Sequence, residues 1–304
     1  MMKCTVCGGT ATIKISRHNA AFCEKHFIEH IHRQVLRVVK KYRMFSESDK
    51  IILAVSGGKD SLGTWRILLD LGYRVTAVHI NNGFGEYSDI SEQCVRDFAR
   101  NANAELRVFK FEELMGFEFK TALRYTRKSP CSLCGSFKRY NLNRIAGELG
   151  GDVLATAHNL DDETAFLLGN ILYWHINYLK KQKPVLEAEK GLVKKVKPVI
   201  RITDEEMKTY SEVRGIRYVE AKCPYVKHPT THFYKRIMDE LQDKFPSVKG
   251  VFYFGFVDKL LPNIDERETP EVAHYCPECG YKTILSDKCF ICTIKELIKN
   301  AEGT

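Results

Sequence analysis

From residue 51 onward, short apolar runs alternate with stretches of helical periodicity, and this alternation constrains the fold more than any other feature of the chain. Four runs have the length and composition of buried strands: "IILAV" (51–55), "RVTAVHI" (74–80), "ELRVFKF" (105–111) and "DVLATAH" (152–158). Helical patterns follow three of them, at 62–69, 90–102 and 159–172. Strands that alternate with helices predict an α/β fold with a parallel sheet and helices on both faces. Ligands of such sheets bind beyond the carboxyl ends of the strands.

Composition narrows the class of protein. With 304 residues, 44% of them apolar, the chain is long enough to bury a sizeable core and to form more than one folded unit. It has no run of about 18 apolar residues that would span a membrane, and its start lacks a signal-peptide pattern. We therefore expect a cytoplasmic protein, in which disulfides are rare. The net charge of +9, concentrated in clusters of Lys and Arg, suits a polyanion such as nucleic acid.

A glycine-rich loop, "SGGKDS", directly follows the first predicted strand. Its two glycines allow the backbone to approach an anion closely, and the helix that follows offers free N–H groups and the positive end of its dipole. Lys59 adds a full positive charge, and two serines add hydroxyl donors. The loop differs from the GxxxxGK[ST] type. We expect a phosphate-binding site made of Ser56, Gly57, Gly58, Lys59, Asp60 and Ser61.

Both ends of the chain carry paired metal-ligand residues. The N-terminal pairs, "CTVC" and "CEKH", and the C-terminal pairs, "CPECG" and "CFIC", supply Cys4, Cys7, Cys23 and His26, and Cys276, Cys279, Cys289 and Cys292. Four soft ligands in two short pairs are typical of structural zinc. Such small segments have almost no core, so the metal supplies folding energy. We expect two closed zinc sites. The alternative for each is a group of cysteines packed as small hydrophobic residues.

A helix is expected directly after the first zinc set. Apolar residues recur there at steps of three and four, at Phe27, Ile31, Val35, Val38 and Tyr42. His30 and His32 lie in the same stretch. We expect both to be surface residues rather than ligands.

Three further cysteines fall within the α/β region: Cys131, Cys134 and Cys223. Three thiolates underfill a tetrahedral zinc, but they can hold three irons of a cubane cluster and leave the fourth iron open. A third zinc completed by His228 or His232 is one alternative. A persulfide on Cys131 or Cys223, resolved by a neighbouring thiol, is another. Cys94 lies in a helical stretch, and we expect it to be a buried apolar residue.

The loop "SGGKDS" resembles the signature of the PP-loop ATP pyrophosphatase superfamily, whose members cleave ATP between its α- and β-phosphates. The motif "PCSLCG" with a later lone cysteine, placed between two zinc sets, resembles the tRNA 2-thiolation enzymes of the TtcA/TtuA group over essentially the whole chain. This resemblance implies a Rossmann-like core of the adenine nucleotide alpha hydrolase type, flanked by zinc-binding ribbons. The expected organisation is a zinc knuckle at 1–27, a linking helix at 28–48, a catalytic domain at 49–268 and a zinc ribbon at 269–304.

The resemblance also implies a reaction. ATP adenylates the C2 oxygen of a uridine, expected to be the ribothymidine at tRNA position 54, and sulfur then replaces that oxygen. The implied cofactors are ATP, Mg²⁺ bridging its phosphates, two Zn²⁺, and a [4Fe-4S] cluster on the three central cysteines whose free iron holds the sulfur. The implied partners are tRNA, a ubiquitin-like thiocarboxylate carrier or sulfide as sulfur donor, and a second copy of the chain.

The same resemblance assigns roles to individual residues. Lys138 matches the catalytic lysine of the family, where a cation would stabilise negative charge on the C2 oxygen. Asp162 matches the catalytic aspartate, as metal ligand or proton acceptor. Cys131 and Cys223 are expected to take part in sulfur transfer. We expect the nucleotide site to include Ala54, His79, His158 and Asp161, although acidic residues in a first helical turn commonly only complement the dipole.

Other functions fit parts of the sequence. Thiolation of the wobble uridine by the same chemistry is one alternative, and a cysteine-persulfide mechanism is another. An amidation enzyme or lysidine-type ligase would use the same loop but would need no central cysteines. A non-catalytic, zinc-ribbon RNA-binding adaptor would not need the intact Lys59, Asp60 and Ser61.

Overall fold

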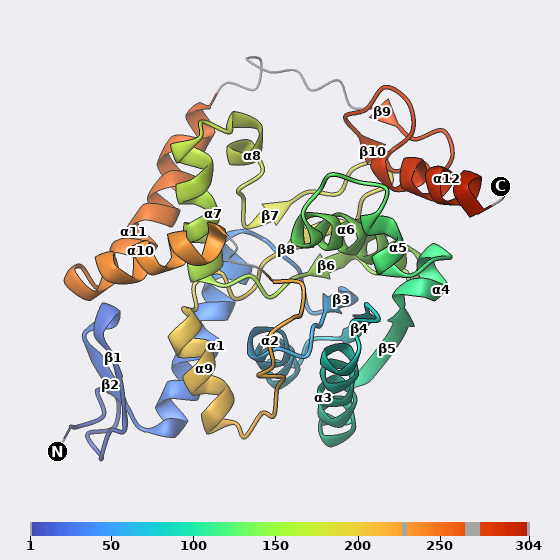
Figure 1. Cartoon of the computed structure of the whole chain (residues 1–304). Coiled ribbons are helices and arrows are strands. Elements are labelled where there is room, and N and C mark those ends of the chain that lie inside the picture. Colours follow the sequence, from blue (N-terminus) through green and yellow to red (C-terminus); the bar gives the residue numbers. More distant parts are fainter. Residues whose placement is uncertain (1, 227–229, 265–273, 303–304) are drawn as a thin grey trace.

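A mixed sheet of six strands forms the centre of the computed structural model, which describes residues 2–226, 230–264 and 274–302 (Figure 1). The strand order is β5-β4-β3-β6-β8-β7, and every pairing is parallel except that of β7 with β8. The strands are β3 (Ile51–Ala54), β4 (Val75–Asn81), β5 (Glu105–Lys110), β6 (Val153–Ala155), β7 (Val185–Leu186) and β8 (Lys194–Val196). The predicted α/β fold with a largely parallel sheet is therefore confirmed.

The sheet has a topological switch point beside β3. The chain runs from β3 outward to β4 and β5, and then returns to the opposite side of β3 as β6. Connections on the two sides therefore leave in opposite directions, which opens a crevice beyond the carboxyl ends of β3 and β6. The loop "SGGKDS" follows β3 at this point. The edge strand β7 and its neighbour β8 lie outside the four apolar runs, because both are short and β8 begins with two lysines.

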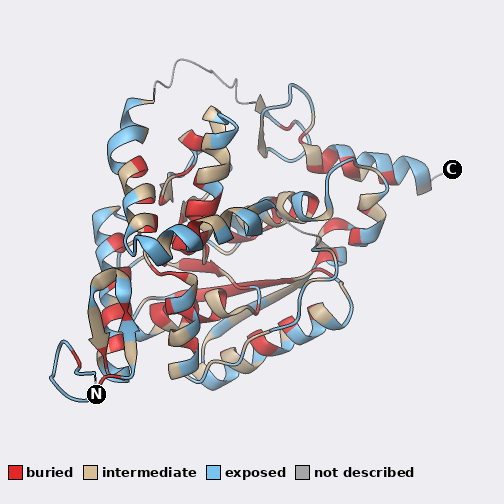
Figure 2. Ribbon diagram, turned by 60° about the vertical axis from the view of Figure 1, so that its left-hand side comes forward, coloured by how far each residue is buried: buried red, intermediate tan, exposed pale blue. Residues whose placement is uncertain are grey.

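Side chains that alternate along β3 enter two separate cores. Ile51 and Leu53 face a core shared with α1 (Glu24–Lys41), α2 (Lys59–Asp70) and other helices. Ile52 points into a second core, shared with α6 (Pro130–Glu148) and the C-terminal segment. This period-two alternation is what places helices on both faces of a sheet. Figure 2 shows the buried strands enclosed between helices whose outer faces are exposed.

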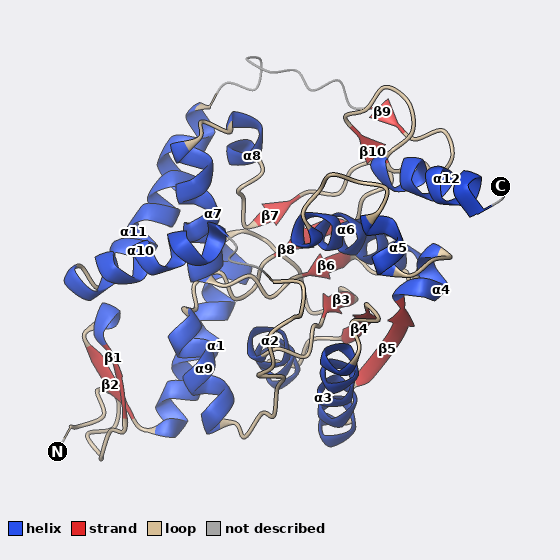
Figure 3. Cartoon of the chain, viewed as in Figure 1, coloured by secondary structure: helices blue, strands red, loops and turns tan. Residues whose placement is uncertain are grey.

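The remaining helices surround the sheet, and several of them gather on one side of it (Figure 3). They are α3 (Glu86–Ala102), α4 (Phe111–Met115), α5 (Phe119–Leu123), α7 (Leu160–Leu172), α8 (Ile176–Lys180), α9 (Asp204–Val213), α10 (Thr230–Lys244), α11 (Val248–Gly255), the π-helical η2 (Phe256–Leu260) and the 3-10 turn η3 (Leu261–Asn263). None of the helices in the described ranges is long and apolar enough to cross a membrane.

Small units precede and follow this α/β body (Figure 1). The first is a hairpin whose strands β1 (Ile13–Ile15) and β2 (Ala20–Phe22) are joined by the 3-10 turn η1 (Ser16–His18). The last consists of β9 (His274–Tyr275), β10 (Lys282–Thr283) and α12 (Phe290–Glu302).

Two expectations about the histidines of α1 were wrong. His30 is buried, with only 8% of its surface exposed, and His32 is half-buried. The hairpin covers one side of α1 and α9 packs near another, which the periodicity of α1 alone does not reveal: His30 stacks on Phe22 of β2, and His32 contacts Tyr210 of α9. Cys94 is buried in α3, as expected.

Candidate active site and metal centres

Hydrogen bonds from its own side chains fix the conformation of the loop after β3. Gly58 is the N-cap of α2, and Ser61 in the first turn donates to the Gly58 carbonyl at 2.9 Å and accepts from the Ser56 backbone N–H at 3.1 Å. Gly57 adopts a left-handed φ of +83°. These contacts fix the loop above the free N–H groups of α2, which is the arrangement that binds phosphate.

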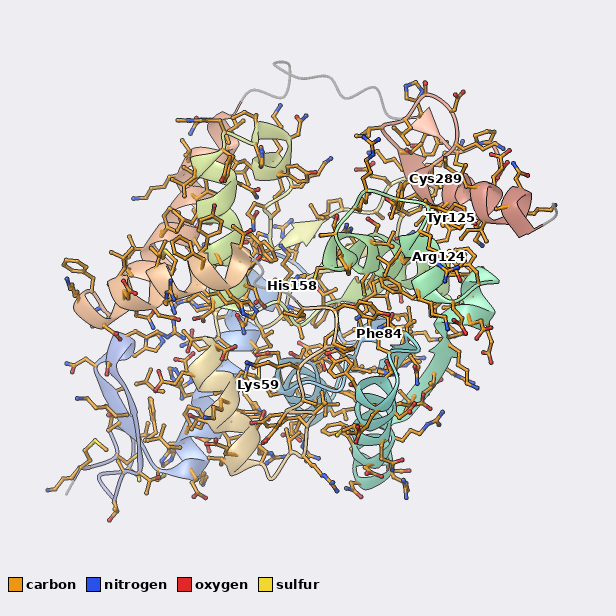
Figure 4. All side chains as sticks on the ribbon, in the orientation of Figure 1. Lys59, Phe84, Arg124, Tyr125, His158 and Cys289 are labelled. Atoms are coloured by element: carbon orange, nitrogen blue, oxygen red, sulfur yellow. The ribbon has the colours of Figure 1, made fainter. Side chains whose placement is uncertain are left out.

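Lys59 is ion-paired rather than freely exposed. Its Nζ lies 2.9 Å from Asp60 Oδ2 and 2.7 Å from Oδ1 of Asp204, the first residue of α9. Although burial opposes the effect, these two carboxylates raise the pKa of Lys59, so the amine stays charged. In the view of Figure 4, Lys59 lies near α9. Phosphate oxygens that enter the loop would therefore compete with Asp204 for the ammonium group.

Two neighbouring carboxylates open α7, each with a different partner. Asp162 forms a capping box with Asn159 and is paired with Lys235 of α10. Asp161 accepts from the backbone N–H of Asp204 at 2.9 Å and is paired with the buried Lys249 of α11. Asp161 is thus tied into the protein interior, whereas Asp162 remains partly exposed at the crevice.

Asn159 connects the two sides of the switch point. Its side-chain nitrogen donates to Asp60 Oδ1 at 3.0 Å, across the crevice from α7 to α2. His158, one residue earlier and labelled in Figure 4, lies in the loop between β6 and α7, 3.7 Å from the Glu163 carboxylate. The predicted residues of the loop and of the "TAHNLDDE" segment therefore line one crevice, and His158 borders it.

A pocket lies beyond the carboxyl ends of β3 and β4, beside the loop. Its lining includes Ala54 and Ser56, together with His79, Tyr87 of α3 and Lys138 of α6. The His79 side chain is 3% exposed and its Nδ1 lies 2.9 Å from the Val55 carbonyl oxygen. Burial lowers the pKa of His79, so the imidazole is neutral. The structure thus brings the predicted Ala54, Ser56 and His79 together with the predicted Lys138.

Cys131, Cys134 and Lys138 occupy one face of α6 because they follow one another at steps of three and four residues. Ser129 caps this helix by accepting from the Ser132 N–H, and Pro130 occupies its first position. Burial raises the pKa of Cys134, and the positive charge of Lys138 opposes that rise. Lys138 therefore acts on the thiol of Cys134 and also borders the pocket beside the loop.

The loop carrying Cys223 is anchored by an aromatic contact. Tyr225 packs against Phe84, which follows β4, and against Phe119 of α5, at ring-centroid distances of 4.8 and 5.5 Å. Burial raises the pKa of Tyr87, with further contributions from the charges of Cys223 and Cys134. The charges of both thiols therefore act on Tyr87, although Cys223 comes from a distant part of the chain.

The spacing of the three central thiols differs from that of a single-ion site. In the described chain, the sulfur atoms of Cys131, Cys134 and Cys223 do not all lie within 4.8 Å of one another, whereas the ligand atoms of each terminal set do. Thiolates that share one zinc lie about 3.8 Å apart at Zn–S distances of 2.3 Å, whereas each cluster thiolate binds its own iron. His228 lies outside the described residues, and His232 is exposed on α10 and belongs to none of these sets.

Both terminal cysteine sets are assembled as tight four-ligand groups: Cys4, Cys7, Cys23 and His26, and Cys276, Cys279, Cys289 and Cys292. Cys23 Sγ lies 3.2 Å from His26 Nδ1. Burial raises the pKa of Cys4, but backbone N–H groups outweigh it and lower this pKa to about 6, which favours a thiolate. The donor types and distances in each set suit zinc.

The C-terminal set also supports α6. Tyr281 packs against Tyr140 of α6, and the Lys128 ammonium lies 3.7 Å from the centre of the Phe290 ring. The segment containing Cys289, labelled in Figure 4, thus adjoins the helix that carries Cys131 and Cys134.

Sequence reasoning missed several residues of this site. Asp204 contacts Lys59 of the loop, and Asn159 contacts Asp60. Tyr87 lines the pocket beside the loop, and Tyr225, two residues after Cys223, packs against Phe84. The segment "TDEE" contains the capping box of α9 and so marks a helix start at Asp204. No local signal in the sequence would have indicated that this start faces Lys59.

Comparisons with known proteins agree with this arrangement. Residues 3–28 match the family described as 2-thiouridine synthetase TtuA, N-terminal LIM domain, and residues 27–225 match the PP-loop domain. The chain is 38% identical over 294 residues to the tRNA-5-methyluridine(54) 2-sulfurtransferase of Pyrococcus horikoshii, covering 96% of this chain and 93% of the relative. It is also 38% identical over 283 residues to the Thermus thermophilus protein of the same name, covering 93% and 88%.

A solved structure shows the same fold. The U34-tRNA thiolase NcsA from Methanococcus maripaludis, with its [4Fe-4S] cluster, superposes with a TM-score of 0.79 at 25% identity. The match covers 89% of this chain and 92% of the thiolase. The chain therefore belongs to the tRNA-5-methyluridine(54) 2-sulfurtransferase family of PP-loop proteins.

Proposed function

We propose that this chain is an ATP-dependent tRNA 2-sulfurtransferase that replaces the C2 oxygen of 5-methyluridine 54 with sulfur. One observation carries this proposal: Lys138 and Tyr87 border the pocket beside the loop, and Lys138 lies one helical turn from Cys134 on the same face of α6. A base held at this border would meet activated phosphate on one side and a sulfur source on the other. The two curated relatives, each 38% identical and named for position 54, favour that position over the wobble uridine.

The first step transfers AMP from ATP to the C2 oxygen of the base. Backbone N–H groups of the Gly57–Gly58 turn and the charge of Lys59 would hold the β- and γ-phosphates, which leave as pyrophosphate. The adenosine would occupy the pocket beside Ala54 and His79. Lys138 would stabilise the negative charge on the α-phosphate oxygens while the C2 oxygen forms its bond to phosphorus and pyrophosphate leaves.

Mg²⁺ would bind at the acidic side of the crevice, where Asn159 hydrogen-bonds Asp60 of the loop with its side-chain nitrogen and the Asp162 backbone N–H with its side-chain oxygen. Hard carboxylate oxygens are the ligands that Mg²⁺ takes alongside substrate phosphates. When bound, the ion would neutralise charge on the departing pyrophosphate. Asp162 must release Lys235 to serve as a ligand or to accept a proton, whereas Asp161 is tied to Lys249 and would act by positioning α7.

In the second step, sulfur forms a bond to C2 and AMP leaves with the former C2 oxygen. Cys131, Cys134 and Cys223 fit a [4Fe-4S] cluster, because three thiolates spaced beyond single-ion distance can each bind a separate iron. When bound, the cluster supplies an open iron for exogenous sulfide. Arg139 and Lys138 would offset the negative charge of the thiolates.

Several further assignments belong to this proposal. The two terminal sets would each hold one Zn²⁺, within a knuckle at 1–27 and a ribbon at 269–304. The catalytic domain would span 49–268, after a linking helix at 28–48. We propose a cytoplasmic homodimer that receives sulfur from a thiocarboxylate carrier or from sulfide.

The proposal is tested with anaerobically purified, iron-reconstituted protein, ATP, sulfide and a tRNA carrying 5-methyluridine 54. Nucleoside analysis by mass spectrometry should show 2-thiolated 5-methyluridine, and the same tRNA with cytidine at position 54 should remain unmodified. Thiolation of a wobble uridine, with position 54 untouched, would replace this proposal with its main alternative. Equal thiolation by iron-free protein would favour the persulfide mechanism.

A further inference from the structure

A third group of metal-ligand residues lies outside the site described above. His18 of η1, His30 of α1 and Glu206 of α9 each offer a ligand atom, and these three atoms lie within 4.8 Å of one another. His30 and Glu206 are 8% and 2% exposed, so the group is largely closed to solvent. The three residues come from the hairpin, the first long helix and the α/β body.

The two imidazoles have unused nitrogen atoms. Nε2 of His18 and Nε2 of His30 are both buried without a hydrogen-bond partner. A buried polar atom left unpaired has lost its hydrogen bonds to water without replacement, and such atoms call for an explanation. The two rings meet edge to face at a centroid distance of 5.0 Å, and His30 also stacks on Phe22. Stacking fixes both ring planes but leaves the nitrogens unsatisfied.

The Glu206 carboxylate has one acceptor position to spare. Arg17 Nε donates to Oε1 at 2.8 Å, while Oε2 accepts from Arg17 Nη2 at 2.6 Å and from the Thr203 N–H at 2.9 Å. An ionised carboxylate offers about four lone-pair positions, so three are filled and one on Oε1 is free. Arg17 also orients the carboxylate, as partners of metal-bound carboxylates do.

We propose that His18, His30 and Glu206 bind a divalent transition-metal ion of the zinc class. Two imidazoles and one carboxylate are a known three-residue ligand set for zinc, with a water molecule completing the coordination. Each histidine would use a nitrogen that otherwise has no partner. Burial keeps both imidazoles neutral by lowering their pKa values, and a ligand must be neutral to bind.

The charge around this site distinguishes it from the two cysteine sets. Arg17 already balances the charge of Glu206, and Arg201 lies nearby. The ion would therefore keep more net positive charge than zinc bound by thiolates. We expect weaker binding than at either cysteine set, so a mild chelator should remove this ion first.

The site would join the N-terminal hairpin to the helix that faces the PP-loop. Glu206 lies in the first turn of α9, whose first residue, Asp204, is paired with Lys59. An ion shared by the hairpin, α1 and α9 would hold this turn in place. The inference does not depend on the thiolation activity, because none of the three ligand residues, His18, His30 and Glu206, belongs to the proposed active site.

Cobalt(II) titration of the full-length, zinc-containing, iron-free protein tests the proposal. After mild chelation, the wild type should bind one more Co²⁺ per chain than His30→Phe, which keeps the ring stacked on Phe22 and removes both nitrogens. This additional ion should show the ligand-field absorption of a nitrogen- and oxygen-bound cobalt without the thiolate-to-metal charge-transfer band that cysteine sites produce. His18→Gln should lose the same ion.

His32→Phe is the matched control, since His32 lies on the same helix but outside the group and contacts Tyr210 instead. This variant should bind as many ions as the wild type. The proposal is overturned if the wild type binds no ion of this spectral type, a result that does not depend on the folding of any variant. It is equally overturned if His30→Phe and His18→Gln retain the ion.

Discussion

Gly57 has a backbone conformation that other residues adopt only with strain. Its φ is +83°, and a Cβ atom at this position would lie 2.6 Å from the carbonyl oxygen of Ser91. Gly58 beside it has a φ of −80°, and a Cβ there would meet only Ser56 Oγ at 3.5 Å. The two glycines of one motif therefore differ in how much they tolerate a side chain.

We predict that Gly57→Ala lowers the free energy of unfolding by about 1–3 kcal/mol and abolishes ATP binding, because the loop must move away from α3. Gly58→Ala should unfold at nearly the wild-type urea concentration. Urea unfolding and nucleotide titration measure the two effects. Equal stability of the two variants would contradict this view of the loop.

Lys138 lines the pocket beside the loop and shares one face of α6 with Cys131 and Cys134. We predict that Lys138→Met lowers tRNA-dependent pyrophosphate release about 100- to 1,000-fold, the usual loss when one charge-stabilising donor is removed. The iron content should stay unchanged, because Lys138 is not a ligand. Lys120→Met, which removes an exposed lysine paired with Glu118, is the control. A variant that retains normal release would exclude Lys138 from the adenylation step.

The segment that carries Cys223 depends on an aromatic anchor rather than on regular structure. Tyr225→Ala removes the ring that contacts Phe84 and Phe119, so Cys223 should lose its fixed position near α6. We predict lower iron content and weaker visible absorption after anaerobic reconstitution. Tyr225→Phe retains the ring and should reconstitute like the wild type. Normal iron content in Tyr225→Ala would show that the loop does not need this anchor.

The folded structure of the C-terminal unit should depend on its bound metal. Three of the six buried apolar residues described in this unit are cysteines of its metal set. Cys276→Ser should therefore lose one zinc per chain and unfold this segment. Elemental analysis should show that the N-terminal zinc remains. Hydrogen exchange should detect the added mobility of α12 and of its contact with Tyr140. Full zinc occupancy in this variant would refute the assignment.

The elements could be predicted from sequence where local pattern determines them. Four central strands and the helices at 24–41 and 160–172 follow apolar periodicity and caps. The short strands β7 and β8 could not be predicted in this way, because strand pairing at the sheet edge stabilises them and their composition does not mark them as strands. In the site, motifs indicated Lys59 and the cysteines, whereas Asp204 and Tyr87 are near them only through tertiary packing. The burial of His30 likewise depends on the hairpin that covers it.

In the proposed reaction, the molecule activates the base at the PP-loop and delivers sulfur at the central cysteines. We predict that Cys134→Ala keeps tRNA-dependent pyrophosphate release but loses thiolation, because its PP-loop is intact. Lys59→Ala should lose both activities. Parallel assays of pyrophosphate and thiolated nucleoside distinguish the two variants. Loss of pyrophosphate release in Cys134→Ala, with normal ATP binding, would mean that the two halves are coupled before adenylation.

The pairing of Lys59 with Asp204 also bears on how the protein is made. These residues are 145 positions apart in the chain, and Asn159, 99 positions from Asp60, joins the same crevice. A nascent chain that has emerged only through β4 contains the complete "SGGKDS" motif but none of these partners. Long-range contacts form late in folding because their loops are costly to close. The crevice joined by these contacts should therefore be complete only after Asp204 has been synthesised, although the whole motif that lines it is present once residue 61 has been added.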